Sequence, residues 1–436
     1  MQGWTEAMRE PRVAFVNLGC RVNRVEVDDI AARLESLGAH VSPLEEADAV
    51  VINTCAVTGE AETKTRKAIR HAAGLPGSPQ VFATGCVVSL FADEVSVLAD
   101  NVTCVADKTR VADEVASYLG LLGGDSAIEH SCQSVTPTGR TRPGIKVQDG
   151  CDNRCTYCIV WKARGPARSI TPEQVIASVR EQLGRGAREV VLTGINLGRY
   201  ESRDACDRPY DVTRLLQLLL DSTDVGRIRL SSIEPQDVSD DLLRLIGQSD
   251  GRVAPFLHIP LQAGCDATLR RMARAYDTSF YLDRVNAARD LVGDDLSLGC
   301  DLIVGFPGET DDDFATSLAL CEQCGFTRMH VFRYSKRPGT PAASMDGQIP
   351  AQEMSRRARE ARELARRMRL DAARARVGNV ELVTMKYPEQ GVSGGLFDVH
   401  VAGRPGELLM ARIIDVEVDA LQGVPIGVRP DGGPTV

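Results

Sequence analysis

Short apolar runs alternate with helical patterns along most of the chain, and this alternation is the strongest constraint on its fold. In the first region the apolar runs lie at residues 13–19, 49–54, 80–85 and near 101–105. Residues 24–37 and 60–73 have the spacing of amphipathic helices. Buried strands that alternate with helices form parallel sheets with helices on both faces. Residues 10–120 are therefore predicted to form a parallel α/β domain.

A second series of strand and helix patterns follows a segment that is typical of a linker. Residues 121–143 are rich in glycine, serine, threonine and proline and have no periodicity. Six strand candidates then lie at residues 145–150, 189–194, 227–232, 256–262, 296–306 and 328–334. Six consecutive βα units predict a partial barrel, which occupies residues 144–376 together with an arginine-rich helix at 352–376. Residues 377–430 contain short strand-like runs and glycines, and we expect a small β module there.

The composition favours a cytosolic protein in which cysteines bind metal or do chemistry. The formal net charge is -9, and no apolar run approaches the roughly 18 residues of a membrane span. The N-terminal residues lack the basic and apolar segments of a secretory signal, so we expect a cytoplasmic location without membrane association. Disulfides are rare in that compartment, and the 13 cysteines are an odd number. Clustered cysteines in this chain therefore point to metal binding or catalysis.

Three cysteines follow the first apolar run of the second series with the spacing C-x3-C-x2-C: Cys151, Cys155 and Cys158. Three thiolates on one short loop suit a cubane iron–sulfur cluster, which normally takes four cysteines. With only three, one iron keeps an open position, and an open position is typical of a catalytic metal site. The alternative is a structural zinc ion, with Cys132 or His130 as the fourth ligand.

Cys20, Cys55 and Cys86 each lie one or two positions after a predicted strand of the first domain. The carboxyl ends of parallel strands meet at one edge of a sheet and line the ligand crevice. The three thiols are therefore expected to converge, although no local spacing marks them as a motif. The alternative is that they are small buried hydrophobic residues, as free cysteines often are.

The loop GCDNRCTYC resembles the loop of the radical S-adenosylmethionine (SAM) enzymes. The resemblance extends over nearly the whole chain to the methylthiotransferases, through NLGCRVNRVE, VINTC, ATGC, LTGINLGRY, LSSIEP, HIPLQAG, DLIVGFPGET and HVFRYSKRPGTPA. It implies that a [4Fe–4S] cluster on the loop cysteines, together with SAM, makes a radical. It also implies a second [4Fe–4S] cluster on Cys20, Cys55 and Cys86, and a second SAM that donates the methyl group.

The surroundings of the first cysteine, LGCRVN, resemble the group of this family that acts on N6-threonylcarbamoyladenosine in tRNA. VINTCAVTGEAETKTRK and KARGPARS are similar to that group as well, whereas Trp161 and Lys162 depart from its usual proline–aromatic pair. The resemblance implies methylthio transfer to C2 of this adenosine at position 37. It implies three partners: the tRNA anticodon stem-loop, a reducing electron-transfer protein and a sulfur donor. Alternatives are isopentenyladenosine-37 of tRNA, an aspartate of ribosomal protein S12, or a non-catalytic metal-containing RNA-binding protein.

Further positions are predicted to contact SAM or RNA. Tyr157 is where the family carries an aromatic residue that contacts the adenine of SAM. Four residues lie at the ends of the second, third and fourth barrel strands: Gly194, Asn196, Glu234 and Gln262. The alternative for these four is a structural role in capping turns. Phosphate contacts need clustered cations, and the candidates are Lys64, Arg66, Lys67, Arg164, Arg168, Arg333 and Lys336. The C-terminal module occupies the position of the family's RNA-binding TRAM domain.

Overall fold

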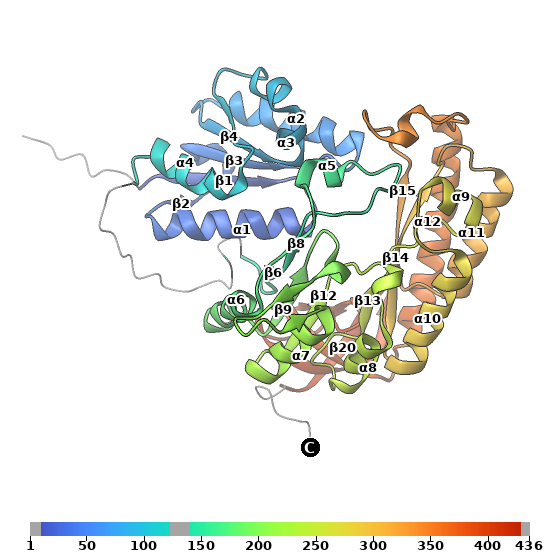
Figure 1. Ribbon diagram of the computed structural model, residues 1–436. Coiled ribbons are helices and arrows are strands. Elements are labelled where there is room, and N and C mark those ends of the chain that lie inside the picture. The colour runs from blue at the N-terminus through green and yellow to red at the C-terminus, as the bar shows by residue number, and fades with distance from the viewer. Residues whose placement is uncertain (1–9, 123–135, 137–138, 429–436) are drawn as a thin grey trace, which may run out of the picture. The chain divides into compact units, whose positions relative to one another are not determined.

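The computed structural model describes residues 10–122, 136 and 139–428, and the chain divides into two compact units (Figure 1). The first unit is Met1–Gly139 with Lys162–Arg164, and the second is Arg140–Trp161 with Gly165–Val436. Of the helices within the described ranges, none is long and apolar enough to cross a membrane. Most of the predicted linker lies outside the described residues, and the predicted domain boundaries remain predictions.

The first unit contains a five-stranded parallel sheet in the order β2-β1-β3-β4-β5. Its strands are β1 (Arg12–Asn17), β2 (His40–Val41), β3 (Ala49–Thr54), β4 (Gln80–Gly85) and β5 (Val102–Cys104). Its helices are α1 (Arg21–Ser36), α2 (Gly59–Ala73), α3 (Cys86–Ser96) and α4 (Val111–Tyr118). The pair α1 and α4 covers one face of the sheet and the pair α2 and α3 the other (Figure 1). Leu34 and Val115 are buried against Val51 and Phe82 of the sheet, and the predicted parallel α/β fold is confirmed.

Six parallel strands of the second unit follow one another in chain order, as predicted for a partial barrel. One sheet has the order β12-β9-β6 and the other β13-β14-β15, and a parallel bridge between Ser232 and His258 connects them. The strands are β6 (Gly144–Lys146), β9 (Glu189–Thr193), β12 (Arg227–Leu230), β13 (Phe256–His258), β14 (Ser297–Val304) and β15 (Arg328–Arg333). The strand predicted at 256–262 ends at His258, because Pro260 has no N–H to donate and Gln262 has a positive φ of 65°.

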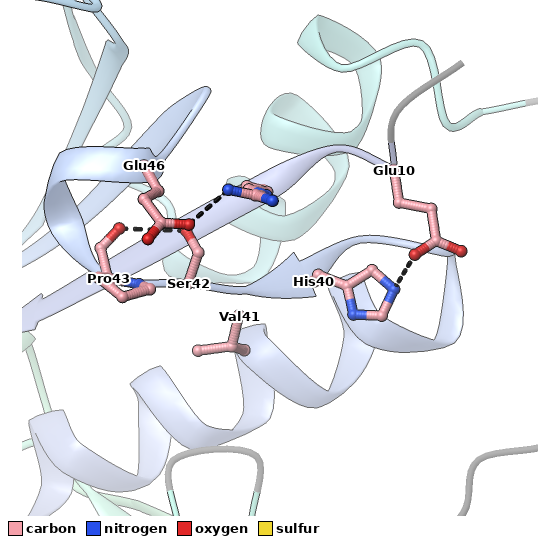
Figure 2. Close-up of a pocket in the computed structure, with 7 residues that line it drawn as sticks. Glu10, His40, Val41, Ser42, Pro43 and Glu46 are labelled. Carbon is pink, nitrogen blue, oxygen red and sulfur yellow. Dashed lines mark hydrogen bonds and ion pairs between the residues drawn. The ribbon is translucent and has the colours of Figure 1, made fainter. Parts of the chain in front are cut away.

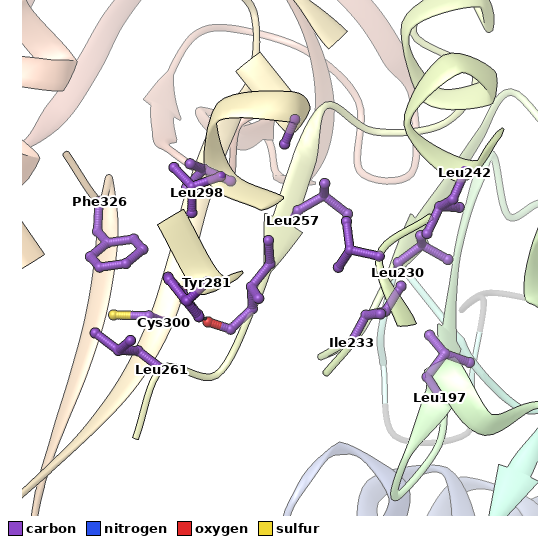
Figure 3. Packing of buried hydrophobic residues seen from close by; sticks show 14 of the residues in the cluster. Leu197, Leu230, Ile233, Leu242, Leu257, Leu261, Tyr281, Leu298, Cys300 and Phe326 are labelled. Carbon is purple, nitrogen blue, oxygen red and sulfur yellow. The ribbon is translucent and has the colours of Figure 1, made fainter. Parts of the chain in front are cut away.

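Helices pack against these strands and form the core of the second unit with them. They are α6 (Pro172–Gly184), α7 (Val212–Ser222), α8 (Asp240–Gln248), α9 (Asp266–Arg271), α10 (Thr278–Val292), α11 (Asp311–Cys324) and α12 (Ala351–Arg374), and the short α5 (Val160–Arg164) precedes them. Two short antiparallel pairs are β7 (Gln148–Asp149) with β8 (Arg168–Ser169) and β10 (Ser202–Arg203) with β11 (Pro209–Tyr210). Leu230, Leu257 and Leu298 are buried in the core that Figure 3 shows, and Cys300 lies among them.

The C-terminal strands form the expected small β module, a closed barrel in the order β16-β17-β18-β20-β19. The strands are β16 (Val380–Tyr387), β17 (Gln390–Ser393), β18 (Asp398–His400), β19 (Leu408–Glu417) and β20 (Ala420–Val428). Val383, Met385, Phe397 and Val399 fill its interior. Closure leaves few unpaired strand edges, so a module this small is stable with a modest core.

Buried charges fix this module to the amino ends of β9 and β12. Glu189, Arg227 and Arg229 form ion pairs, and none of the three side chains is exposed. Burial alone would raise the pKa of Glu189, but the charges of Arg227 and Arg229 outweigh it and lower that pKa. Arg227 also donates to the Leu382 carbonyl at 2.6 Å, and Arg229 donates to the Gly394 carbonyl at 2.7 Å. These contacts leave the carboxyl ends of β9 and β12, at the opposite edge of the sheet, available for a functional site.

Candidate functional site

The loop of residues 151–158 begins where β7 ends, and its geometry depends on Gly150. Gly150 has a φ of 74°, and a Cβ there would lie 1.9 Å from the carbonyl oxygen of Pro166. Glycine is therefore required at this turn. Inside the loop, the Cys158 N–H donates to the Cys155 carbonyl at 3.0 Å, which closes a tight turn around the second and third cysteines.

The thiols of Cys151, Cys155 and Cys158 are close enough to interact electrostatically. Burial, followed by the charges of Cys155 and Cys151, raises the pKa of Cys158 to about 12. Burial and Cys155 raise the pKa of Cys151 in the same way. Three thiolates in such surroundings need a positive partner, and the irons of a cluster supply that charge. The donor set therefore fits a [4Fe–4S] cluster, and its ligation by these residues stays a prediction.

Within the described ranges, no three His, Cys, Asp or Glu side chains are placed to hold a single metal ion. A cluster of four irons and four sulfides is larger than one ion, so its thiolate ligands stand further apart than the ligands of zinc. The two residues considered as a fourth zinc ligand, Cys132 and His130, lie outside the described residues.

Cys20, Cys55 and Cys86 lie at one edge of the first unit's sheet. Cys20 is the N-cap of α1, Cys55 follows β3, and Cys86 opens α3 directly after β4. Burial, followed by the charges of Cys86 and Cys20, raises the pKa of Cys55 to about 11, so the three thiols are neighbours. Helix N-termini favour thiolates, which adds to the fit for a second cluster. The assignment of these three as its ligands stays a prediction.

Asn23, in the first turn of α1, supports the position of Cys20. The Cys20 thiol donates to Asn23 Oδ1 at 3.2 Å, and Asn23 Nδ2 donates to Asn53 Oδ1 at 2.7 Å. A Cβ on Gly19 would lie 2.2 Å from the side-chain carbon Cγ of Asn23. The glycine and the asparagine of the LGCRVN segment are therefore explained together, because the first leaves room for the second.

Arg164 is buried in the first unit, which contradicts its prediction as an RNA contact. Only 1% of its side chain is exposed. Its Nη1 donates to Glu26 Oε1 at 2.9 Å, and its Nη2 donates to Asn23 Oδ1 at 2.8 Å. Lys108 Nζ also donates to Glu26, at 2.9 Å, so one carboxylate holds two cations. The charge of Arg164 also favours the thiolate form of Cys55.

Two buried acceptors at the end of β9, Thr193 Oγ1 and Asn196 Oδ1, have no hydrogen-bond partner in the described part of the chain. The Asn196 N–H donates to Gln148 Oε1 at 2.8 Å, and its Nδ2 lies 4.0 Å from Cys151 Sγ. A Cβ on Gly194 would lie 2.9 Å from Gln148 Oε1, so this glycine keeps the segment close. Buried polar atoms without partners are costly and therefore indicate a ligand. Two acceptors beside the cysteine loop suit an ammonium group, such as that of SAM.

Glu234 forms a buried ion pair with Arg274, a residue that the sequence analysis missed. Arg274 Nη2 donates to Glu234 Oε2, and its Nη1 donates to Cys155 Sγ at 3.1 Å. Burial raises the pKa of Glu234, although the charge of Arg274 opposes this shift. No spacing in the sequence marks Arg274, because its contacts come from distant segments. The pair places Glu234 beside the cysteine loop, and contact of Glu234 with SAM stays a prediction.

Tyr157 and Gln262 have structural contacts of different kinds. The Tyr157 ring lies edge-on to Phe306, with the ring centroids 6.4 Å apart, and burial raises the pKa of Tyr157 well above its usual value. The Gln262 N–H donates to the Asp301 carbonyl at 2.8 Å, so this residue turns the chain after β13. Contact of either side chain with SAM stays a prediction.

The other cations predicted for RNA lie at the surface. Four have polar partners, in the pairs Lys64–Glu60, Arg66–Glu62, Arg168–Asp149 and Arg333–Ser355. Lys67 and Lys336 are exposed. Exposed ion pairs contribute little stability, so these partners would be exchanged for phosphate at small cost. Their role in RNA binding stays a prediction.

A surface pocket of the first unit lies away from the thiols (Figure 2). Its lining includes Arg12 at the amino end of β1 and His40 of β2, whereas the cysteines follow the carboxyl ends of β1, β3 and β4. Arg12 pairs with Glu46 and His40 with Glu10, and all four side chains are substantially exposed. The pocket is a set of self-paired surface charges and adds nothing to the site.

Two family models match this chain. The description "Radical SAM superfamily" matches residues 145–321, and "Uncharacterized protein family UPF0004" matches residues 12–107. The two matches contain the two cysteine sets separately. The radical SAM enzyme TsrM from Kitasatospora setae, solved with cobalamin and a [4Fe–4S] cluster, has a similar fold with a TM-score of 0.53. That likeness covers 77% of this chain and 74% of that chain at 14% identity, so it concerns the fold alone.

Curated relatives match over most of the chain. The threonylcarbamoyladenosine tRNA methylthiotransferase MtaB of Thermotoga maritima is 33% identical over 92% of this chain and 94% of its own length. The MtaB protein of Bacillus subtilis is 36% identical over 77% and 76%. The tRNA-2-methylthio-N(6)-dimethylallyladenosine synthase of Novosphingobium aromaticivorans is 31% identical over 93% and 96%. The relatives therefore share one kind of chemistry and carry two substrate names.

Proposed function

Because this chain belongs to the radical SAM tRNA methylthiotransferase family, we propose that it adds a methylthio group to C2 of N6-threonylcarbamoyladenosine at position 37 of tRNA. The observation that carries the proposal is the similarity to the Thermotoga maritima relative along nearly the full length of both chains. The LGCRVN segment around Cys20 supports the same substrate. A relative named for dimethylallyladenosine matches almost as well, so isopentenyladenosine is the second candidate substrate.

Members of this family use SAM and two [4Fe–4S] clusters, and the described residues offer a place for each. We assign one cluster to Cys151, Cys155 and Cys158 and the other to the three cysteines of the first unit. When bound, these groups supply the radical that removes hydrogen from C2 and the sulfur and methyl group that replace it. The open iron of each set depends on the chain providing three thiols and no fourth.

The chain's own groups hold and orient the SAM that binds beside the loop. Thr193 Oγ1 and Asn196 Oδ1 would accept hydrogen bonds from its ammonium group, which would satisfy two buried atoms at once. Arg274 lies against Cys155 and Glu234, and its charge opposes the rise in the pKa of Glu234 that burial causes. Tyr157 provides an aromatic edge on the same loop for the adenine.

The RNA partner is the anticodon stem-loop of tRNA, and its phosphates require local positive charge on a chain of net charge -9. The proposed phosphate contacts do not include Arg164, because it is buried. They are Lys64, Arg66, Lys67, Arg168, Arg333 and Lys336. The C-terminal barrel is a second proposed RNA contact, by its position in the family. A reducing electron-transfer protein and a sulfur donor complete the proposed partners.

The test is nucleoside mass spectrometry of tRNA from a strain without this gene. We expect loss of 2-methylthio-N6-threonylcarbamoyladenosine and its return when the native gene is restored. The 2-methylthio-isopentenyladenosine of the same sample is the internal control and should not change. Unchanged threonylcarbamoyl product, in a strain without a paralogue, would refute the substrate assignment.

A non-catalytic RNA-binding protein is the alternative from another class. Iron and acid-labile sulfide analysis of anaerobically reconstituted protein separates the two. Two cubane clusters give about eight of each per chain. Zinc without sulfide would support the non-catalytic protein.

A further inference from the structure

Four ring side chains form a continuous row across β13 and β15 of the second unit. The centroids of Phe256 and His258 are 6.5 Å apart, those of His258 and His330 5.7 Å, and those of His330 and Phe332 6.5 Å. Successive side chains of a strand point to opposite faces. Leu257 packs into the core shared with the helices, so the row occupies the other face of the strands.

The row is buried at the end formed by Phe256 and exposed to solvent at the end formed by Phe332. Phe256 is buried against Val392 and Leu396 of the C-terminal barrel. Phe332, in contrast, is 42% exposed, and His330 is exposed as well. A large aromatic side chain left open in a strand of a parallel sheet is unusual, because parallel sheets are normally covered on both faces.

Phe332 lies near the carboxyl end of β15, and the chain that follows this strand packs near the cysteine loop. Tyr334 directly follows Arg333, the last residue of β15, and its ring centroid is 5.4 Å from that of Phe306. Phe306 in turn contacts Tyr157, whose neighbour in the chain is Cys158. The chain that leaves the carboxyl end of β15 therefore packs against the site already described.

Acidic groups flank the row where it approaches the site. His258 Nε2 lies 3.1 Å from Asp301 Oδ1, on the strand between β13 and β15. The charge of Asp301 also reaches Glu234, whose pKa is raised by burial first and by this charge in addition. The open rings thus have hydrogen-bond acceptors at their margin, which suits a flat ligand with N–H groups on its edge.

We infer that Phe332 and His330 form the platform on which the target purine of the RNA stacks. This inference rests on the proposed function, because that function makes an RNA base the substrate. A base that stacks face-on leaves its edge atoms free in the plane of the ring. C2 is an edge atom, so stacking on β15 leaves C2 uncovered for the reaction. Every base has a π-face, so the platform positions the target base without distinguishing one base from another. The N6 substituent is recognised by other contacts.

The test compares Phe332→Ala with Phe280→Ala in the reconstituted full chain. Phe280 is a matched control because it is 39% exposed and lies on α10. The probe is a synthetic anticodon stem-loop that carries N6-threonylcarbamoyladenosine, and its Kd is measured by fluorescence anisotropy. Loss of one stacking contact weakens binding by about tenfold or more. We expect that loss for Phe332→Ala, a native Kd for Phe280→Ala, and recovery of most of the affinity in Phe332→Trp.

Circular dichroism and iron content of each variant show whether it has folded. If folded Phe332→Ala binds within twofold of the native protein, the platform is wrong. If the native enzyme methylthiolates an isopentenyladenosine stem-loop and not the threonylcarbamoyl one, the proposed substrate fails. The platform then still predicts tenfold weaker binding of that other stem-loop by Phe332→Ala. The two failures are thus distinguishable.

Discussion

The two cysteine sets reach similar arrangements by different means. Cys151, Cys155 and Cys158 come from one loop, whose shape is set by Gly150 and by hydrogen bonds within the loop. The cysteines of the first unit come from three strands, so their approach depends on the order β1-β3-β4 of the sheet. A local motif tolerates change elsewhere in the fold, whereas a convergent set depends on the stability of its whole unit.

Each set also has a buried arginine close to one of its thiols. Arg274 donates directly to Cys155, and Arg164 is held by Glu26 and Asn23 in the first unit. A buried cation favours the thiolate form that a cluster requires. The comparison therefore predicts separate chemical roles for the two sets. It also predicts that the two sets respond differently when the residues that hold their cysteines in place are replaced.

The largest expected effect is that of Cys155→Ala on radical formation. Removal of one of three thiols should prevent the loop cluster from forming, so iron falls from about eight to about four per chain. The variant should make no 5′-deoxyadenosine from SAM under reducing conditions, as measured by liquid chromatography and mass spectrometry. Cys206→Ala, which changes an exposed cysteine without a predicted role, should keep both iron and product.

Cys55→Ala should separate the two roles. The loop set is intact in this variant, so 5′-deoxyadenosine should still form while the methylthio product on the stem-loop disappears. Iron should again fall to about four per chain. Identical product patterns for Cys55→Ala and Cys155→Ala, each with one cluster lost, would show that the division of labour is wrong.

The sequence predicted the elements that depend on local pattern. Apolar runs locate β1, β3 and β4, and parallel topology then places Cys20, Cys55 and Cys86 at one edge of the sheet. The strand predicted at 256–262 was too long because the apolar pattern continues through Pro260, which cannot donate a ladder hydrogen bond. Local pattern therefore locates elements better than it locates their ends.

The buried ion pairs could not be predicted from the sequence. Arg164 follows the cysteine loop in a basic segment, and basic segments usually lie in solvent, so an RNA contact was predicted. Its carboxylate partner, Glu26, lies 138 positions earlier in the chain, and no periodicity connects the two. The same holds for Arg274 and Glu234, whose pairing depends on the tertiary fold alone.

Arg164→Ala tests whether the arrangement of Cys20, Cys55 and Cys86 depends on the stability of the first unit. The change removes one cation from the buried Glu26, which keeps its pair with Lys108, and breaking a buried pair costs about 3 kcal/mol. We expect the urea midpoint of the first unfolding transition of the cluster-free chain to fall accordingly. Arg168→Ala is the control, because that side chain is 59% exposed and its pair contributes little. Equal midpoints for the two variants would contradict a supporting role for Arg164.

Asp237→Asn gives the smallest expected effect and tests a carboxylate with poorer support than Glu26. Asp237 Oδ2 is buried without a hydrogen-bond partner among the described residues, and Asp237 Oδ1 lies 3.2 Å from Arg199 Nε. Burial raises the pKa of Asp237 to about 6, from about 3.9 in the unfolded chain. The folded protein therefore binds the proton more tightly, and this group costs stability as the pH rises from about 4 to about 6.

Asparagine removes that cost, so Asp237→Asn should stabilise the second unit by about 1 kcal/mol at pH 7 and have almost no effect at pH 4. Urea unfolding at both pH values measures the difference, with Asp283→Asn as the exposed control. The stabilisation must disappear on acidification if burial of the charge is its cause. A gain of the same size at pH 4 would show that side-chain hydrogen bonding, and not burial of the charge, causes the stabilisation. The buried charge of Asp237 would then carry no cost, and Asp237 would be as well supported as Glu26.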